Sequence, residues 1–598
     1  MSLNSELSEL FSSLAAMMEL KGENTFKVIA FAKVGRIIRE VNIDLKRCME
    51  EGKLCDIEGI GKGSRQIIEE YIQTGESTVY QEIAASVPAG LVPLLSIEGL
   101  GPKTIHLLWR ERNITGLDEL EKAVRSGAIK GLKGIGDKKL QTILSGIELH
   151  KSRLADGGSG AVRRIGIGEA LEPAQELLER LRAIPGVLQA ELAGSLRRRR
   201  ETIADVDLVA ALAPSAVARD IAQAFTQLPG VVQTIGSGQS KTSVKVSNGM
   251  QVDLRLVPPE HFGSAMLYFT GSKEHNVKIR GLAQKKSLTL NEWGLYDIAA
   301  YEKAPKQTAR PPELEPLASQ TEAQVYAALG LEYIEPELRE DRGEVEAAVV
   351  RKLPALITRA DIRGDLHNHT TESDGTATIE QMARAAKAMG YEYLAITDHS
   401  KALAMTNGLS VDRLIKHVEN IHRLNSKLKG ITLLAGSEVD ILADGRMDYE
   451  DAVLKELDIV IASPHLSLKQ DGRKATARLL RAIENRCVNI IGHPTGRLIN
   501  RREGLPLDFP TLFKAAAANG TAMEINSSYP RLDLDEFHAR AAIEAGVMLS
   551  IDTDAHSTGE LDSIFFGIAV ARRAWATKDN VLNCQPLTKV KKFLSAKR

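Results

Sequence analysis

Cysteine is scarce in this sequence, and the four present, Cys48, Cys55, Cys487 and Cys584, form no C-x-x-C pair. That scarcity argues against a disulfide framework and a cysteine zinc site, and it is typical of a reducing compartment. Long hydrophobic runs are also missing, since no apolar stretch approaches the roughly 18 residues that a membrane helix needs. The N-terminus MSLNSELSELFSSL has neither a basic n-region nor a cleavage site. We therefore expect a cytoplasmic protein without a membrane partner.

An excess of either charge is missing as well. Lysine plus arginine (77) nearly cancels aspartate plus glutamate (78), which gives a formal net charge of -1 over 598 residues. This balance excludes a globally basic nucleic-acid coat, so any nucleic-acid binding must come from local clusters. One such cluster lies between 271 and 310, where eight basic residues stand against four acidic ones. At roughly 100 to 200 residues per domain, the length predicts several domains.

The hydrophobic pattern changes twice along the chain. Up to about residue 150, apolar residues recur at i, i+3 and i+4, as in LSELFSSLAAMMEL, which predicts an all-α region. From about 188, short β-branched runs alternate with helices and predict a mixed α/β domain. From 363 onward, short apolar strands alternate with helical segments, the rhythm of a barrel with parallel strands. The predicted linkers or boundaries are 155–164, 304–316 and 335–362.

A short motif occurs three times in the all-α region, as IEGIGKGSRQII (57–68), IEGLGPKTIHLL (97–108) and LKGIGDKKLQTI (132–143). In each copy a G-x-G turn opens a helix, so that backbone N–H groups at the helix start can point at a phosphate. A glycine turn between packed helices is the alternative for any single copy. Three copies with Lys62, Lys103 and Lys138 just beyond the turns favour DNA. The segments resemble the helix-hairpin-helix motif of DNA-repair proteins.

Two aspartates, Asp205 and Asp207, lie two residues apart on the apolar strand of ADVDLVAAL, so both carboxylates leave the same face. A third candidate, Asp253, lies on the alternating strand MQVDLRLV. Three carboxylates from two strands can hold two divalent cations, which favours phosphoryl transfer. Upstream, Ser195 follows a glycine at a strand-to-turn junction, and the run Arg197–Arg200 offers a guanidinium cradle for a triphosphate. The alternative is a solvated arginine run with two acids at a strand edge.

Six of the thirteen histidines fall in short motifs after residue 366, nearly all at the end of an apolar run. Barrel strands deliver the residues at their carboxyl ends to one catalytic rim. Imidazoles and carboxylates without a thiolate suit Mn²⁺, Zn²⁺ or Fe²⁺ better than Ca²⁺. A structural role is the alternative for any one histidine, but six at strand ends argue against it. The ligand candidates are His367, His369, Asp374, His399, Glu438, His465, His493, Asp554 and His556.

These motifs resemble two known families. The series G-S-x-R-R…D-x-D, D-L-R-L, LYFTGSKEHNVKIR and LNEWGLY resembles the palm and thumb of family X DNA polymerases, the DNA polymerase beta-like group, over residues 1 to about 330. The histidine motifs resemble the polymerase and histidinol phosphatase (PHP) domain, a distorted β/α barrel, over 363 to about 575. Both halves in one chain resemble the bacterial family X DNA polymerases.

The resemblance implies six parts: a helical 8-kDa-like DNA-binding domain (1–85), helix-hairpin-helix fingers (86–154), a nucleotidyltransferase palm (155–258), a thumb (259–334), a linker (335–362) and the PHP domain (363–598). By the same resemblance Asp205, Asp207 and Asp253 are the catalytic triad, with Mg²⁺ or Mn²⁺ as its cofactor. The implied nucleotide and DNA contacts are Ser195 and Arg198 to the triphosphate, Tyr268, Phe269 and Gly271 beside the sugar, Asn276 near the base, Arg280 to the template and Lys241 to the primer.

In the PHP half the resemblance implies up to three divalent metals, Mn²⁺ or Zn²⁺. The implied sets are His367, His369, Glu438 and Asp554 for the first metal, Asp374, His399 and His556 for the second, and Glu438, His465 and His493 for the third. Glu438 would bridge two of them. A metal cluster of this kind serves the hydrolysis of phosphoesters.

The sequence departs from the family pattern at three positions. The family usually has glycine where Ala204 and Arg199 stand, and we expect a methyl group beside the metal site and a charge near the triphosphate to slow incorporation. Members with 5'-deoxyribose-phosphate lyase activity carry a Schiff-base lysine at the position of Ile67, which has no amine. We therefore expect weak or absent lyase activity, unless Lys27 substitutes.

The interpretation that follows is a DNA polymerase that fills short gaps in base-excision repair, with a metal-dependent 3'-5' exonuclease or 3'-end phosphatase in its PHP domain. Its expected partners are gapped or nicked DNA with a 5'-phosphate and deoxynucleoside triphosphates, and it is expected to be a monomer. One alternative is a DNA-binding scaffold with an inactive polymerase half and an active PHP phosphoesterase. A small-molecule phosphatase is a further alternative, which the fused DNA-binding modules disfavour.

Overall fold

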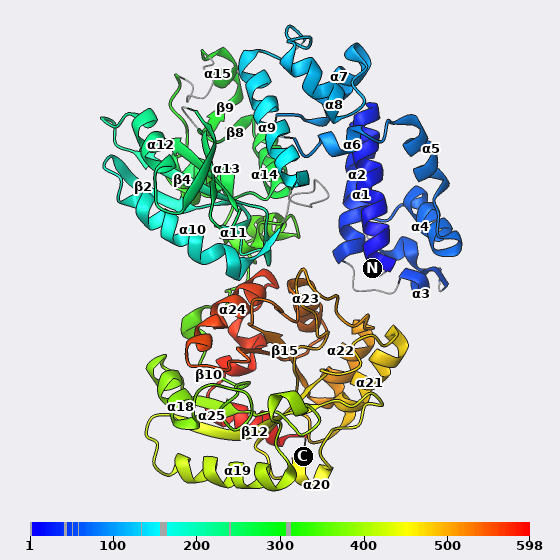
Figure 1. The fold of residues 1–598 in the computed structure, drawn as a ribbon, viewed down its shortest axis with the longest axis vertical. Coiled ribbons are helices and arrows are strands. Elements are labelled where there is room, and N and C mark those ends of the chain that lie inside the picture. The colour runs from blue at the N-terminus through cyan, green and yellow to red at the C-terminus, as the bar shows by residue number, and fades with distance from the viewer. Residues whose placement is uncertain are drawn as a thin grey trace. The chain divides into compact units, whose positions relative to one another are not determined.

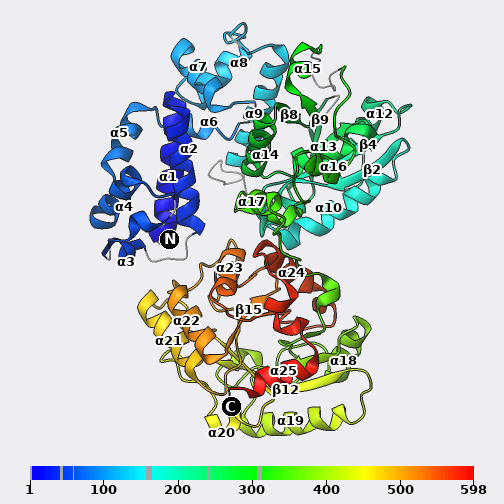
Figure 2. The same ribbon diagram turned by 180° about the vertical axis from the view of Figure 1, so that it is seen from behind.

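The computed structural model describes residues 3–40, 45–50, 52–57, 59–97, 99–132, 134–155, 164–238, 241–305 and 313–597. The chain divides into two compact units, Met1–Arg163 and Arg164–Arg598 (Figures 1 and 2). Almost all of the predicted linker at 155–164 and the middle of the one at 304–316 lie outside the described residues. Among the helices that are described, none combines the length and the apolar character that crossing a membrane requires.

The first unit is helical in the part that the structure describes, as the sequence predicts. Helices α1 and α2 lie side by side, and buried residues such as Leu7, Phe11 and Leu14 of α1 belong to the core of this unit (Figure 1). The helices are α1 (Leu3–Lys21), α2 (Thr25–Glu40), α3 (Leu45–Glu50), α4 (Lys62–Thr74), α5 (Thr78–Ser86), α6 (Leu91–Leu94), α7 (Pro102–Arg112), α8 (Leu117–Arg125) and α9 (Asp137–Ala155).

Each G-x-G turn of the repeated motif directly precedes a helix. Gly61 is the last residue before α4, Gly101 is the last before α7, and α9 begins directly after Gly136. The first glycine of each copy has a positive φ, for example +95° at Gly59, a conformation that is costly for residues with a side chain. The predicted glycine turns at helix starts are confirmed.

The second unit begins with a five-stranded sheet in the order β2-β4-β7-β6-β5. Val209 and Ala211 of β4 pack in a cluster with residues of α13, and because side chains alternate along a strand, Asp205 and Asp207 share this face. A short pair, β1 (Ile165–Gly166) with β3 (Thr202–Ile203), flanks the sheet. The other elements are α10 (Ile167–Arg182), β2 (Val187–Leu192), α11 (Gly194–Arg197), β4 (Asp205–Leu212), α12 (Ala218–Thr226), β5 (Val231–Ser237), β6 (Lys241–Val246), β7 (Gln251–Val257) and α13 (Phe262–Thr270).

The thumb region combines helices with one hairpin around its own core. Val345 and Ala348, which lie in the segment predicted as a linker, are part of that core, so 335–362 is packed rather than extended. The elements are α14 (Lys273–Lys285), β8 (Leu288–Asn291), β9 (Gly294–Asp297), α15 (Ile298–Lys303), α16 (Glu322–Ala328), η3 (Pro336–Leu338), α17 (Glu344–Val349) and η4 (Arg359–Asp361).

The last part is a parallel sheet of seven strands in sequential order, β10 to β16. A parallel bridge between Asn368 and Ala555 joins the two ends of the sheet, which gives the predicted β/α barrel. The strands are β10 (Gly364–Asp365), β11 (Tyr393–Ile396), β12 (Thr432–Asp440), β13 (Ile459–Ser463), β14 (Ile490–Ile491), β15 (Ala522–Asn526) and β16 (Leu549–Asp552). The helices are α18 (Ile379–Ala388), α19 (Val411–Asn425), α20 (Asp451–Leu454), α21 (Gly472–Glu484), α22 (Phe509–Asn519), α23 (Glu536–Glu544), α24 (Ile564–Arg573) and α25 (Leu587–Ser595).

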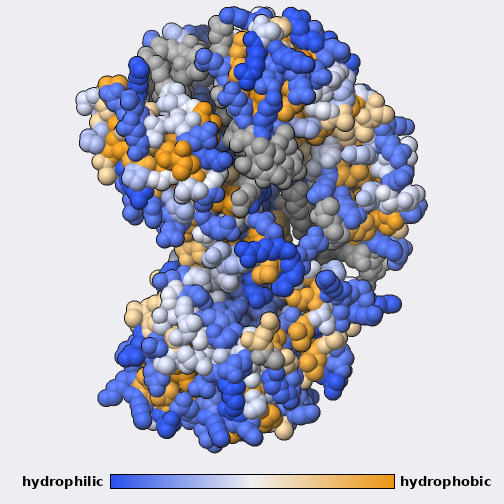
Figure 3. All heavy atoms as spheres, in the orientation of Figure 1, coloured by the Kyte–Doolittle hydropathy of each residue, from blue (hydrophilic) through white to orange (hydrophobic). Residues whose placement is uncertain are grey.

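Apolar residues are concentrated in these cores. On the face shown in Figure 3, small hydrophobic patches lie among hydrophilic residues. The inward side chains of the barrel strands, among them Tyr393, Ile461 and Ile490, are fully buried. Because the interior below is filled by apolar side chains, polar side chains at the strand ends are confined to one rim.

Candidate active sites

The predicted polymerase residues meet at one pocket of about 600 Å³ in the palm and thumb. Of those residues, Asp253, on β7, and Lys241, on β6, are not part of the pocket lining. The lining residues are Arg164, Gly194, Ser195, Arg198, Arg200, Ala204, Asp205, Asp207, Tyr268, Phe269, Thr270, Gly271, Lys273, Asn276, Val277 and Arg280.

The three aspartates crowd one another at the edge of this pocket. Asp253 pairs in register with Asp207 across the parallel strands β7 and β4. Burial, and then the charges of Asp205 and Asp253, raise the pKa of Asp207 to about 7. One oxygen of Asp253 lies 2.9 Å from Nζ of Lys241, and Nε2 of Gln251 donates to the other oxygen at 3.0 Å. Three acids this close together, one of them buried, form a group of oxygen ligands that fits a site for divalent cations.

The Gly-Ser turn after β2 packs directly against these acids. Gly194 has φ +60°, and a Cβ at this position would lie 2.3 Å from Oδ2 of Asp207, so the turn requires glycine. The N–H of Ala193 donates to the carbonyl of Asp207 at 2.8 Å. The turn is therefore fixed to the strand that carries the acids, and Ser195 is held at the same pocket.

The arginine run after the turn is paired rather than solvated. Arg198 lines the pocket, and its Nε donates to Glu340 at 3.0 Å. Arg200 also lines the pocket and donates to Glu536 at 2.9 Å. The run therefore brings two guanidinium groups to the pocket with their charges already balanced by acids.

Arg199, where the family usually has glycine, is not part of the pocket lining. Its φ of +55° lies in the left-handed region, which explains why glycine suits this position. Its guanidinium pairs with Glu337 at 3.2 Å and covers the ring of Phe565 at 4.6 Å. The expected extra charge near the triphosphate is thus directed away from the pocket, whereas Ala204 does place its methyl group in the lining.

The predicted sugar and base contacts lie where α13 ends and α14 begins. Tyr268 and Phe269 meet edge to face at 5.2 Å, and Nδ2 of Asn276 donates to the carbonyl of Tyr268 at 2.7 Å. Arg280 is exposed on α14. Gly271 joins the two helices with a positive φ. The aromatic pair therefore makes one side of this junction apolar, and Arg280 makes its far end on α14 basic.

In the first unit, Ile67 of α4 is buried in the helical core, with 4% of its surface exposed. Lys27 of α2 is exposed. Ile67 has no amine and is buried, so no Schiff base can form at the position where the family's lyase members carry a lysine. The side chain of Lys138 lies outside the described residues, while those of Lys62 and Lys103 are exposed.

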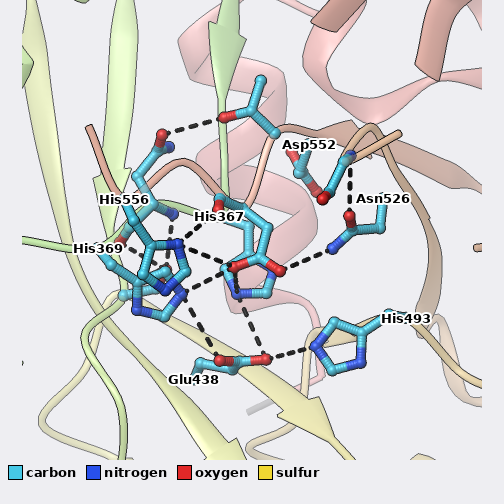
Figure 4. Close-up of polar contacts among 12 residues, drawn as sticks. His367, His369, Glu438, His493, Asn526, Asp552 and His556 are labelled. Atoms are coloured by element: carbon cyan, nitrogen blue, oxygen red, sulfur yellow. Dashed lines mark hydrogen bonds and ion pairs between the residues drawn. The ribbon is translucent and has the colours of Figure 1, made fainter. Parts of the chain in front are cut away.

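At the barrel, all nine predicted ligands meet on the rim at or just beyond the carboxyl ends of the strands. Figure 4 shows how His367, His369, Glu438, His493 and His556 point toward one another. Glu438, on β12, lies at the centre: its oxygens are 2.9 Å from Nδ1 of His399, 2.9 Å from Nε2 of His493 and 3.2 Å from Nε2 of His465. Three groups of ligand atoms lie within 4.8 Å of one another: His369, Asp374, His399 and His556; His367, His369 and Asp554; and His399, Glu438 and His465. These groups overlap the implied sets, but His369 also joins the second set and His399 also joins the third.

The chemistry of the rim fits bound cations. Nε2 of His367 and both ring nitrogens of His369 are buried without a hydrogen bond to any described residue. Burial lowers the pKa of His399, but Glu438 and Asp374 outweigh it and raise this pKa to about 10. Burial, and then the neighbouring His399, lower the pKa of His369 to about 4. Protons alone therefore leave buried nitrogen atoms unsatisfied, which metal ions would satisfy.

A second layer of acids orients the ligands, and the sequence did not single it out. Oε1 of Glu524, on β15, accepts from Nδ1 of His367 at 2.7 Å, and its Oε2 accepts from the backbone N–H of His493. Asp440 lies 3.2 Å from Nδ1 of His465. Both acids lie on barrel strands, but nothing in the sequence separates an acid that contacts a metal from one that orients a metal ligand. Such partners fix which ring nitrogen faces a metal.

Fold and sites together define a class: a nucleotidyltransferase palm with a thumb, joined to a metal-binding β/α barrel. Family models match three parts of the chain: a helix-hairpin-helix domain over 2–77, a DNA polymerase beta thumb over 265–340 and a PHP domain over 365–528. Each match falls on the structural region described for it.

Relatives cover both the whole chain and the barrel alone. The DNA polymerase/3'-5' exonuclease PolX of Bacillus subtilis is 39% identical over 591 residues, covering 98% of this chain and 99% of the relative. Probable phosphatases of Thermoanaerobacter sp. and Caldanaerobacter subterraneus are 31% and 32% identical over 245 residues, covering 39% of this chain and 95% and 91% of the relatives. The chain belongs to the bacterial family X DNA polymerases, which carry a C-terminal PHP domain.

Proposed function

We propose that this chain is a DNA polymerase that fills short gaps and that its barrel processes DNA 3' ends as an exonuclease and phosphatase. The observation that carries the proposal is the single palm pocket, in which paired acids, the Gly-Ser turn and the thumb residues 268–280 meet. Similarity to the Bacillus subtilis enzyme over 98% of the chain supports both activities, and similarity to probable phosphatases supports the second.

In the palm, Asp205, Asp207 and Asp253 would hold Mg²⁺ or Mn²⁺. Bound there, the ions would balance the charge of the triphosphate and activate the attacking oxygen of the primer. The chain's own contacts would be Ser195 and Arg198 on the triphosphate, Tyr268, Phe269 and Gly271 beside the sugar, Asn276 near the base, Arg280 on the template and Lys241 on the primer.

In the barrel, the nine rim ligands would hold up to three ions, Mn²⁺ or Zn²⁺, with Glu438 touching two of them. Bound there, the ions would supply Lewis acidity for water to attack a phosphoester. Glu524 would keep Nε2 of His367 directed at the metal by accepting from Nδ1. Asp440 would do the same for His465.

The DNA partner we propose is gapped or nicked DNA with a 5'-phosphate, bound by the protein as a monomer during base-excision repair. The support is the glycine turn before α4 and before α7, since N–H groups at a helix start can bind a phosphate. Lyase activity should be weak because Ile67 is buried and has no amine. Borohydride trapping on a 5'-deoxyribose-phosphate end tests this, and efficient trapping that Lys27→Ala abolishes would contradict it.

The alternative of a scaffold with an inactive polymerase half rested on Ala204 and Arg199. Because Arg199 pairs with Glu337 and is not part of the pocket lining, only the methyl group of Ala204 still favours it. Primer extension on gapped DNA, with Mg²⁺ or Mn²⁺ and with or without a 5'-phosphate in the gap, separates the two. Extension that is faster with the 5'-phosphate supports the proposal, and no extension with either metal supports the scaffold.

A further inference from the structure

Two residues of the barrel reach the turn that lines the palm pocket. Arg573, the last residue of α24, donates through Nη1 to the backbone carbonyl of Arg198 at 2.6 Å. Glu536, the first residue of α23, accepts from Arg200 at 2.9 Å. Arg573 and Glu536 also bind each other at 2.8 Å. The pair therefore grips the segment at two points that are two residues apart.

This contact is buried and ionic. The side chains of Arg573 and Glu536 are 0% and 3% exposed. Glu340 completes the group, since its Oε1 lies 3.1 Å from Arg573 and 3.0 Å from Arg198. Charged hydrogen bonds removed from water hold their geometry more firmly than surface pairs, and leaving one partner unpaired is costly.

The opposite end of the same segment is fixed to the palm. Gly194 lies so close to Asp207 that a Cβ would collide with its carboxylate, and Ala193 donates to the carbonyl of Asp207. Between the two ends lie Ser195 and Arg198, the predicted triphosphate contacts. The segment 193–200 is thus held by β4 at its start and by the barrel at its end.

The contact with the backbone of the turn distinguishes this pair from two other ion pairs that the barrel makes. Arg497 binds the side chain of Glu201 at 2.7 Å, and Arg572 binds the side chain of Glu337, in the segment after the thumb, at 2.8 Å. A side chain can swing away while its backbone stays in place. Arg573 instead fixes a carbonyl within the turn, next to Arg199 with its positive φ.

We propose that Arg573 and Glu536 are positioning residues of the polymerase site: the barrel holds the turn 193–200 in the shape that binds a nucleoside triphosphate. The inference rests on the proposed polymerase function. Its consequence is that nucleotide affinity in the palm depends on two side chains of the PHP domain. Neither side chain touches the pocket, since both act through Arg198 and Arg200.

Conservative variants of the full-length protein test this. Arg573→Lys keeps a positive charge but cannot bind the Arg198 carbonyl, Glu340 and Glu536 together, and Glu536→Gln keeps the shape without the charge. We expect the KM for a deoxynucleoside triphosphate in single-nucleotide gap filling to rise about tenfold in each, with kcat within about twofold of the unaltered protein. The 3'-end processing rate should stay within about twofold.

Arg540→Lys is the matched control. It changes an arginine of α23 whose guanidinium binds Glu544 of the same helix and neither the turn nor an acid that pairs with the turn. Its KM for the nucleotide should stay at the unaltered value. A KM that moves equally in Arg540→Lys and Arg573→Lys would overturn the inference, because any arginine substitution in this part of the barrel would then have the same effect.

The inference also fails if Arg573→Lys and Glu536→Gln lower kcat and 3'-end processing in parallel at an unchanged KM, since that is the result of general destabilisation. An unaltered protein that adds no nucleotide would instead sink the proposed function. The two failures are therefore told apart by the first rate measured, that of the unaltered protein.

Discussion

The palm and the barrel both gather carboxylates for divalent metals, but they hold them in different ways. In the palm, Asp205 is exposed and the three acids offer oxygen ligands alone. In the barrel, His367, His369 and Glu438 are 0% exposed. Oxygen-only sites with few ligands suit Mg²⁺, which is usually completed by substrate phosphates. The buried imidazole site offers enough ligands to hold an ion without substrate.

The surroundings of the two sites differ in the same sense. In the barrel, Glu524 and Asp440 orient His367 and His465 before any substrate arrives. In the palm, Lys241 pairs with Asp253, so one acid already has a counter-ion. The barrel therefore has its candidate ligands in place in the protein alone, whereas we expect the palm site to be completed when metal and nucleotide bind together.

The largest expected effect is the loss of one activity alone. Replacing Asp205 and Asp207 by alanine together should lower nucleotide addition by about 10³-fold or more, because the remaining Asp253 cannot hold two cations. The 3'-end processing rate should stay within about twofold, since the barrel has its own ligands. Both rates are measured on gapped DNA with Mg²⁺ or Mn²⁺.

Asp220→Ala, an exposed acid on α12, is the control for this double variant and should extend primers at the normal rate. Nucleotide addition that survives the double variant would show that the palm does not depend on these acids.

The next effect concerns Glu438, which lies within reach of five rim histidines. Glu438→Ala should remove 3'-end processing and lower bound metal at more than one site, because a bridging carboxylate screens the repulsion between ions. His465→Ala should be milder, since it empties one site directly. Elemental analysis with both processing rates checks this, and primer extension serves as the folding control. Full metal content in Glu438→Ala would rule out a bridging role.

A smaller effect is expected from the layer behind the ligands. Glu524→Gln keeps the side-chain shape but weakens the hold on Nδ1 of His367, so Mn²⁺ affinity should fall by about 10 to 100-fold. Titration of the chelator-treated protein with Mn²⁺ measures this without any activity. Glu544→Gln, an exposed acid on α23, should bind Mn²⁺ normally. Equal affinities for the two variants would show that the rim ligands orient themselves.

The gathering of the nine candidate ligands on one rim could be predicted from sequence because nearly all of them lie at the end of an apolar run, and parallel strands carry such positions to one rim. The palm acids could be predicted for a similar reason, since the D-x-D spacing places Asp205 and Asp207 on one face. The packing of Ile67 in the helical core also agrees with its apolar side chain.

The partners of the arginine run could not be predicted. Arg200 meets Glu536 from 336 positions away and Arg198 meets Glu340 from 142. No periodicity connects such positions, because the contacts arise only when palm, thumb and barrel pack together. The role of Glu524 could not be predicted for a different reason. The sequence does not show whether an acid inside a strand faces a metal or a ligand of that metal.

The smallest expected effect concerns Glu322, a buried acid that pairs with arginines and not with a metal. Burial alone would raise the pKa of Glu322, but Arg339 and Arg197 outweigh it and lower the pKa to about 2. A group whose pKa is lowered on folding adds stability that is fully present above its unfolded pKa, here 4.5, and is lost as the pH falls towards 2. Arginine, and not a metal, is the counter-ion here.

We therefore expect the free energy of unfolding of the palm and thumb to fall by on the order of 2 kcal/mol between about pH 5 and pH 2 through Glu322. Glu322→Gln should lower stability at pH 7 and flatten this part of the pH profile. Urea unfolding at several pH values measures both, followed by the fluorescence of Trp293 in the thumb hairpin in a background that carries Trp109→Phe and Trp575→Phe. A profile for Glu322→Gln as steep as that of the unaltered protein would assign the acid sensitivity to other carboxylates.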